Sequence, residues 1–164
     1  MNFNDFKGDR LVFKAGTTLY IEKETRMRDL YWLSEGYAIE FTLIDGKEEV
    51  SAFFSSGDFI LPSNRYNTRI ESLINSHFLI LPWKKLVYML RNHPETAMLH
   101  KEIKKIHLEK VKEYRKGLVT KSVGERYIEL IEKLPGIKNV VDAAYIASYL
   151  RISLEQYNIL CMPE

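Results

Sequence analysis

Hydrophobic and polar positions along the chain change their period near residue 82. Between residues 10 and 81, short segments rich in aromatic and β-branched residues are broken by turn signals, a pattern typical of β-strands. The expected strands lie within TTLYIEK (17–23), DLYWLSEG (29–36), YAIEFTLI (37–44), KEEVSAFF (47–54), IESLINS (70–76) and HFLILP (77–82). Asp45-Gly46 predicts a tight hairpin turn, because glycine adopts positive φ at low cost. Many short strands at close spacing favour an antiparallel β-roll, sandwich or barrel.

After Pro82 the apolar positions recur with a helical period. WKKLVYMLRN (83–92) predicts a short helix, and Pro94 suits the first turn of the next one. A long amphipathic helix is expected over 95–118, where a narrow apolar stripe runs among many lysines: Leu99, Ile103, Ile106, Val111, Tyr114 and Leu118. So narrow a stripe favours packing against the same helix of a second copy, which makes these six residues the predicted dimer interface. The alternative is that the stripe packs on the chain's own β-domain.

The last forty residues predict three short helices with recognisable start signals. Ser122 and Glu125 form the pattern of a capping box, in which a hydroxyl and a carboxylate satisfy free backbone N–H groups. Asp142 is the expected cap of the second helix. Ser153 and Gln156 form a second capping box for the third helix.

Composition and charge narrow the class of protein. The content of 46% hydrophobic and 28% charged residues is that of a globular domain and excludes a disordered chain. The N-terminus has no apolar signal region, and the lone cysteine, Cys161, cannot form an internal disulfide, so we expect a cytoplasmic protein with no membrane contact. Residues 101–120 carry 7 Lys/Arg against 3 Asp/Glu and hold the positive excess of the chain. Such a segment suits phosphate contacts, although a solvated helix face explains it equally well.

Motifs of catalysis and metal binding are missing from the sequence. Residues 1–76 contain no His or Cys, which excludes the histidine cluster of a metal-binding β-barrel enzyme. His93, His100 and His107 are seven residues apart, and we interpret them as solvent or dimer-rim histidines rather than metal ligands. No phosphate-binding or nucleophile-elbow motif occurs. We therefore expect no enzyme, no metal and no cofactor, with a small-molecule effector as an open question.

The order of these elements, together with two stretches of sequence, resembles the Crp/Fnr family of bacterial transcription regulators. The stretches are LYWLSEGYAIEFTLIDGKEEVSAFFSSGDFI (30–60) and GERYIELIEKLPGIKNVVDAAYIASYLRIS (124–153). The resemblance implies an α+β fold: an antiparallel, cyclic-nucleotide-binding-like β-roll (jelly roll) over 1–93, a dimerisation helix over 94–118, and a small helical helix-turn-helix domain over 119–164. It also implies a homodimer that regulates transcription by binding DNA.

The effector site of the family is altered in this chain. Members that bind cyclic nucleotides carry a glutamate and an arginine after GDFI, for the ribose hydroxyl and the cyclic phosphate. Here Leu61-Pro62-Ser63 follows GDFI, so the glutamate position holds proline. Ordinary cyclic AMP is therefore not the expected effector. We hypothesise that the next residues form a site for another anion: Ser63, Arg65, Tyr66, Asn67 and Arg69. The alternative is that they form a solvated loop.

The expected helix-turn-helix has a complete scaffold and an unusual reading face. The positions that pack its two helices together are Ile146, Ala147, Leu150, Ile152, Tyr157 and Leu160. Arg151 replaces the usual turn glycine. The candidate DNA-binding residues are Arg151, Ser153, Glu155, Gln156, Asn158 and Lys121. Leu154 and Ile159 stand where family members carry arginines, and apolar residues there favour a second hypothesis: a ligand- or protein-binding module without specific DNA binding.

Overall fold

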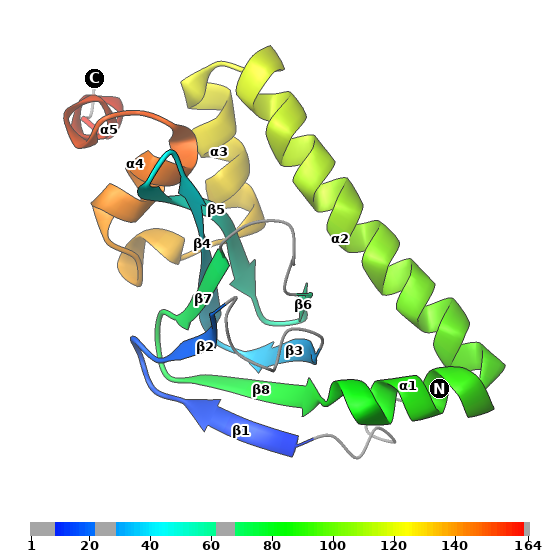
Figure 1. Cartoon of the computed structure of the whole chain (residues 1–164). Coiled ribbons are helices and arrows are strands. Elements are labelled where there is room, and N and C mark those ends of the chain that lie inside the picture. The colour runs from blue at the N-terminus through cyan, green and yellow to red at the C-terminus, as the bar shows by residue number, and fades with distance from the viewer. Residues whose placement is uncertain (1–8, 22–28, 62–67, 163–164) are drawn as a thin grey trace.

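The computed structural model describes residues 9–21, 29–61 and 68–162. Within them, strands come first and helices follow (Figure 1). The strands are β1 (Asp9–Phe13), β2 (Thr18–Ile21), β3 (Leu30–Glu35), β4 (Tyr37–Ile44), β5 (Lys47–Ser55), β6 (Phe59–Ile60), β7 (Thr68–Ser72) and β8 (Ser76–Leu81). The helices are α1 (Trp83–Asn92), α2 (Pro94–Thr120), α3 (Val123–Lys133), the short 3-10 turn η2 (Ile137–Asn139), α4 (Ala143–Leu150) and α5 (Leu154–Leu160).

The strands form two antiparallel four-stranded sheets with a shared core. Their orders are β1-β8-β3-β6 and β2-β7-β4-β5. Alternate residues of each strand point into the core, where Leu33 and Ala38 are fully buried and Phe78 is 1% exposed. The predicted α+β fold with an antiparallel β-domain is confirmed. The strand expected over 70–76 is wrong in its second half, because the hydroxyls of Ser72 and Ser76 both donate to the Ile74 carbonyl and close a turn there.

Two turns of the roll depend on positive φ. Asp45 and Gly46 have φ of 49° and 79°, and they join β4 to β5 as the predicted hairpin. Gly36 has φ of 109° between β3 and β4, and a Cβ there would lie 2.2 Å from the Ser76 Oγ. Only glycine fits this turn. The turn leads directly into β4, whose outer face meets the C-terminal helices.

Helices α1 and α2 cover the outer face of the first sheet and then leave it. Leu86 of α1 and Ile103 of α2 are 2% and 4% exposed, in one apolar cluster with Leu30 and Leu81. Figure 1 shows α2 running from α1 past the roll to α3, so that the chain returns over β4 and β5. No helix in the described ranges combines the length and apolar character needed to cross a membrane.

The three predicted C-terminal helices and their caps are confirmed. Both capping boxes form, at Ser122 with Glu125 and at Ser153 with Gln156, and the Asp142 side chain accepts from the Ala144 amide. The six predicted scaffold positions all lie in the apolar cluster of this region, together with residues of α3 and η2. The short turn η2 is an additional element that the sequence did not predict.

Candidate functional site

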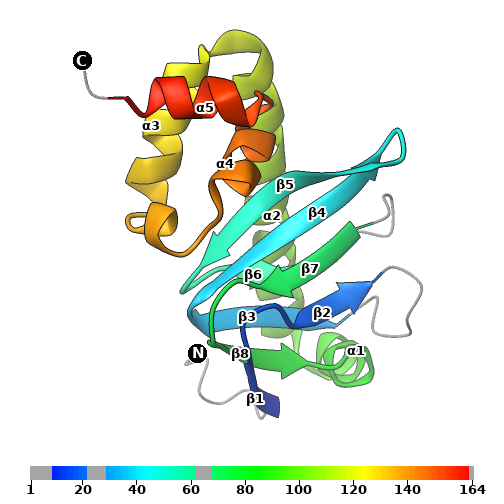
Figure 2. The ribbon, with the colours of Figure 1, turned by 90° about the vertical axis from the view of Figure 1, so that its left-hand side faces the viewer.

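The outer face of β4 and β5 carries the C-terminal helices through α4. Ile39, Phe41 and Val50 form a buried apolar patch on this face. Tyr149 of α4 packs on the Phe53 ring at 5.2 Å and stacks on the Tyr114 ring of α2 at 4.7 Å. Figure 2 shows α4 beside β5, with α5 on the far side of α4. The β-domain therefore contacts one helix of the pair and leaves the other open.

Directional hydrogen bonds fix this docking. The Val50 amide of the edge strand β5 donates to the Ser148 Oγ at 3.0 Å. The Tyr114 hydroxyl donates to the Tyr149 carbonyl at 2.8 Å. The Tyr37 hydroxyl donates to the Pro135 carbonyl at 2.9 Å, just after α3. The hairpin strands β4 and β5 and the helix α2 thus hold the C-terminal helices in one orientation.

Arg151 occupies the turn between α4 and α5 and contacts the β-domain. Its φ of 58° and ψ of 45° are left-handed, which confirms the expectation that arginine stands at a position suited to glycine. Its guanidinium pairs with the Glu49 carboxylate of β5. Partial burial lowers the pKa of Arg151, but an arginine stays protonated in proteins. In this arrangement, the cation in the turn before α5 is neutralised by the roll.

Helix α5 exposes most of its length. Tyr157 is 5% exposed and packs on the Tyr127 ring, with 6.0 Å between ring centroids. The predicted contact residues Glu155 and Asn158 are exposed. Ser153 and Gln156 are partly committed to the cap, since the Ser153 Oγ accepts from the Gln156 amide and the Gln156 Oε1 accepts from the Ser153 amide. The outer surface of α5 therefore carries polar residues beside the exposed apolar Leu154 and Ile159, and Glu155 is its one charged residue.

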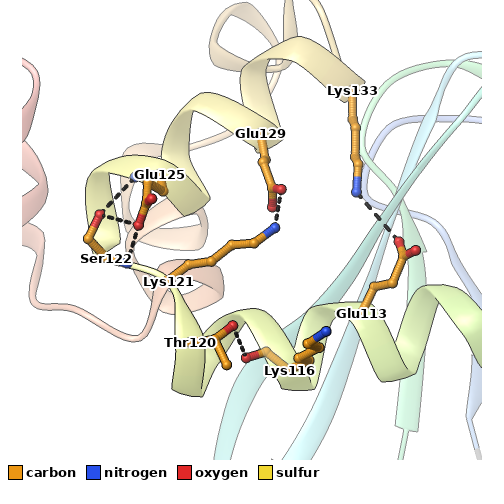
Figure 3. Close-up of polar contacts among 8 residues, drawn as sticks. All are labelled: Glu113, Lys116, Thr120, Lys121, Ser122, Glu125, Glu129 and Lys133. Carbon is orange, nitrogen blue, oxygen red and sulfur yellow. Dashed lines mark hydrogen bonds and ion pairs between the residues drawn. The ribbon is translucent and has the colours of Figure 1, made fainter.

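Lys121 lies at the joint between α2 and α3, shown in Figure 3. Its ammonium pairs with Glu129 of α3, and both side chains are about two-fifths exposed, at 38% and 41%. On the other side of the joint, Lys133 lies 3.9 Å from Glu113. The joint is thus bridged twice by ion pairs, and Lys121 is engaged within the chain.

Arg126 is a structural residue that the sequence pattern did not single out. Its guanidinium donates to the carbonyls of Leu118 at 3.4 Å, Lys121 at 3.1 Å and Leu150 at 2.7 Å. It thereby ties the end of α2 and the end of α4 to α3. The sequence does hold a signal for this role: Arg126 lies one turn before the buried Leu130, on the apolar face of α3.

The predicted effector residues are only partly within the described ranges. Ser63, Arg65, Tyr66 and Asn67 lie outside them. Arg69 is described: its guanidinium pairs with Glu48 at 3.0 Å and with Glu71, and lies 4.1 Å from the centre of the Phe41 ring. Arg69 lies on the outer face of the sheet, and its charge is already paired. Its side chain is therefore not placed to bind a ligand inside the roll.

The inner face of the same sheet carries a carboxyl group instead of a cation. Glu40 follows core residue Ala38 by two positions on β4 and therefore points inward. The Ser51 hydroxyl donates to its Oε1 at 2.6 Å. Burial raises the pKa of Glu40, and the bond from Ser51 offsets part of that rise. An acidic group at this place disfavours a phosphate ligand.

The apolar stripe of α2 is divided between its own chain and solvent. Leu99 and Ile103 pack in the cluster with α1 and β3, and Tyr114 packs on Tyr149. For Leu99 and Ile103 the structure matches the alternative, packing on the chain's own β-domain, whereas Tyr114 packs on the C-terminal helix α4. Val111 and Leu118 are half-buried, while Ile106 is 53% exposed. Other apolar residues on α2 are exposed as well, including Met98, Leu108 and Val119.

The comparisons with known proteins identify the fold. No family model matches the chain, and no curated protein sequence is significantly similar to it. Among solved structures, FixK2 from Bradyrhizobium japonicum superposes with a TM-score of 0.79 at 16% identity, over 93% of this chain and 82% of that one. A protein from Eubacterium rectale assigned to the Crp/Fnr family of transcriptional regulators gives 0.76 at 16%, over 95% and 77%. The c-di-GMP responsive global regulator CLP from Xanthomonas campestris gives 0.68 at 15%, over 93% and 84%.

These three superpositions cover most of each chain, from the β-roll into the C-terminal helices. The chain therefore has the fold of the Crp/Fnr regulators, as the sequence resemblance predicted.

Proposed function

We propose that this chain is a DNA-binding transcription regulator of the Crp/Fnr type, with α4 and α5 as its helix-turn-helix. The observation that carries this proposal is the contrast within the pair: α4 is held by the β-domain, while α5 presents Glu155 and Asn158 to solvent. A recognition helix needs a rigid scaffold behind it and free polar side chains in front, which reach base edges in the major groove.

The same proposal includes a homodimer and the division of the chain at residues 93 and 118. Two recognition helices one turn of DNA apart need a symmetric pair of chains. Ile106, the exposed residue of the predicted apolar stripe of α2, marks the surface that we assign to this contact. Light scattering should give the mass of two chains, and Ile106→Glu should shift the protein toward the monomer.

The roll is proposed to hold an effector other than cyclic AMP. Arg69 is paired outside the roll, and Glu40 places a carboxyl group inside it. The fold itself is not tied to cyclic AMP, since CLP is described as responsive to c-di-GMP. Isothermal titration with cyclic AMP should give no binding to this chain.

DNA binding by α5 should be weak unless Arg151 takes part. Helix α5 has no Lys or Arg, and each phosphate contact supplies affinity through counterion release. Arg151 is the cation in the turn that precedes α5, and Glu49 holds it. DNA phosphate and Glu49 therefore compete for one guanidinium, which gives the roll a direct influence on DNA affinity.

The test is fluorescence anisotropy of DNA from upstream of the chain's own gene against a scrambled duplex, across a salt series. Upstream DNA should bind at least about tenfold more tightly than the scrambled duplex, and the preference should fall in a Glu155→Ala/Asn158→Ala double variant. Glu132→Ala is the matched control, because Glu132 is an exposed carboxylate on α3. Equal affinity for both duplexes, or no binding at low salt, would reject the proposal.

A second candidate function rests on the apolar residues of the same surface. Leu154, Ile159 and Met162 are 46%, 61% and 66% exposed on and after α5. Such residues suit a protein partner better than DNA. A Leu154→Arg/Ile159→Arg variant distinguishes the two functions: it should strengthen DNA binding if α5 meets phosphates and bases, and it should abolish binding of a protein partner.

A further inference from the structure

A β-bulge interrupts the pairing of strands β4 and β5. Glu40 pairs with Ala52, and the next residue, Phe41, pairs with Val50. Ser51 is therefore an extra residue of β5 between these two pairs. The bulge brings the Ser51 hydroxyl onto Glu40: the Ser51 Oγ lies 2.6 Å from the Glu40 Oε1 and 3.2 Å from the Glu40 carbonyl oxygen. One hydroxyl proton thus has two acceptors on the same residue.

The outer side of this bulge holds α4. The Val50 amide donates to the Ser148 Oγ at 3.0 Å, and the Phe41 ring packs against the Tyr145 ring with 5.2 Å between centroids. Both contacts start from the pair of residues next to Ser51. A change in the bulge would therefore reach α4 directly, without crossing the core of the roll.

Glu40 is the ionisable group on the inner side of the bulge. Its neighbours on this face of the sheet are uncharged: Ala38, Thr42, Ala52 and Ile70. Among the residues that the structure describes, the core cluster facing it has Tyr31 as its one titratable member. The charged side chains of Glu48, Arg69 and Glu71 lie on the outer face.

Burial is the main cause that raises the pKa of Glu40, and the hydrogen bond from Ser51 opposes this rise. The two residues are half-buried, so protons from water reach them. The inner side of the bulge therefore carries a carboxyl group that takes up a proton more readily than an ordinary glutamate does.

We propose that Glu40 and Ser51 form a pH-sensitive clamp on the bulge, and that protonation of Glu40 tightens the docking of α4. In the ionised form, the Ser51 hydroxyl donates to the carboxylate. When a proton from water binds the carboxylate, the new carboxyl O–H donates to the Ser51 Oγ, and the Ser51 hydroxyl turns to the Glu40 carbonyl oxygen. Two hydrogen bonds then close the bulge in place of one. The clamp depends neither on DNA binding nor on an effector in the roll.

The direction of the pH effect follows from the raised pKa of Glu40. The folded chain binds this proton more tightly than the unfolded chain does, so the stabilisation is present at low pH and is lost as the pH rises through the raised pKa. Above that pH, a half-buried carboxylate is left with one hydrogen bond and favours the entry of water at the bulge. The bond between the Val50 amide and Ser148 should then open more often.

Nuclear magnetic resonance of the full chain tests the clamp across a pH series from about 4 to 8. The side-chain carboxyl carbon of Glu40 reports its protonation. Amide exchange of Val50, corrected for the intrinsic effect of pH, reports the docking of α4. The protection of this amide should fall about two- to tenfold as Glu40 ionises, the range for one neutral hydrogen bond. The two midpoints should coincide, above the usual range of a glutamate.

Two variants separate the parts of the clamp. Glu40→Gln keeps a donor for Ser51 and cannot ionise, so the Val50 amide should stay protected at every pH. In Ser51→Ala the carboxyl group should still titrate, at a higher pH, while Val50 no longer follows it. Glu71→Gln is the matched control, because this carboxylate lies on the outer face of the same sheet and pairs with Arg69. The control should keep the full pH response.

Any of three results would reject the clamp. The first is a titration of Glu40 that leaves the protection of Val50 constant in the unmodified chain. The second is a pH response of Val50 in Glu40→Gln equal to that of the unmodified chain. The third is a midpoint of Glu40 at or below that of an ordinary glutamate, since no proton would then be favoured at the bulge.

Discussion

Helices α4 and α5 are neighbours of similar length, yet their surfaces are used differently. Helix α4 buries Ile146, Ala147 and Leu150, at 0–2% exposed, and sends Ser148 and Tyr149 to the β-domain. Helix α5 buries Tyr157 and exposes most of its other residues. A helix pair built for stability alone would bury both members. The contrast indicates that α4 attaches the pair to the roll, while α5 is kept free for a partner, which we propose is DNA.

The largest effect should come from removing buried volume in α4. Leu150→Ala deletes a side chain with no exposed surface, and such changes cost about 2–5 kcal/mol of unfolding free energy. Leu154→Ala, at a residue 46% exposed on α5, should change it by less than about 0.5 kcal/mol. Urea denaturation of both variants measures the difference. Equal losses would mean that α5 is part of the core.

The next effect concerns the ion pair between the β-domain and the turn. Glu49→Gln removes the carboxylate that holds Arg151, so the guanidinium becomes available to DNA. We expect DNA affinity to rise severalfold and the salt slope to steepen by about one unit, the value for one added phosphate contact. Glu48→Gln is the control, because Glu48 pairs with Arg69 instead. A similar gain in both variants would indicate a general charge effect and would argue against competition for Arg151.

Backbone strain at Arg151 should give a smaller, purely conformational effect. Arg151→Gly and Arg151→Ala both lose the ion pair with Glu49, but only glycine adopts a φ of 58° without strain. The glycine variant should therefore be more stable than the alanine variant by about 1 kcal/mol in urea denaturation. If the two were equally stable, the turn would not be left-handed in solution.

Lys121 should give the smallest effect on stability. It pairs with Glu129 at an exposed joint, and exposed ion pairs contribute about 0–1 kcal/mol. Thermal denaturation of Lys121→Gln and of its neighbour Lys116→Gln should differ little. The salt dependence of DNA affinity distinguishes a lysine that pairs only with Glu129 from one that contacts DNA. A log–log slope lower by about one unit in Lys121→Gln, but not in Lys116→Gln, would mean that Lys121 leaves Glu129 for a phosphate.

Local signals in the sequence predicted most of the fold. Alternation predicted the strands, Asp45-Gly46 the hairpin, and Ser122 and Ser153 the helix starts, because each depends on neighbours a few residues away. The order of these elements, together with two stretches of sequence, indicated the resemblance to the Crp/Fnr family, and the solved structures confirm that fold.

Long-range pairing explains what the sequence could not predict. Glu49 and Arg151 are about a hundred residues apart, and nothing in either neighbourhood indicates that they meet. The same holds for Tyr114 and Tyr149, whose rings stack. Because of this contact, part of the predicted dimer stripe packs on the chain's own helix α4. Arg69 looked like an anion ligand within its segment, yet Glu48 on β5 and Glu71 on its own strand both pair with it. Of the DNA-binding candidates, Ser153, Glu155, Gln156 and Asn158 are exposed at or on α5, and their role stays a prediction.

The most direct test of the account is amide hydrogen exchange of the protein with and without its own upstream DNA. The account predicts that DNA slows exchange across α5, residues 154–160, and leaves the Val50 amide, which is bonded to Ser148, as protected as before. This result would show that α5 meets DNA while α4 stays docked. Unchanged exchange in α5 with altered exchange at Val50 or along α4 would contradict the assignment of the two helices.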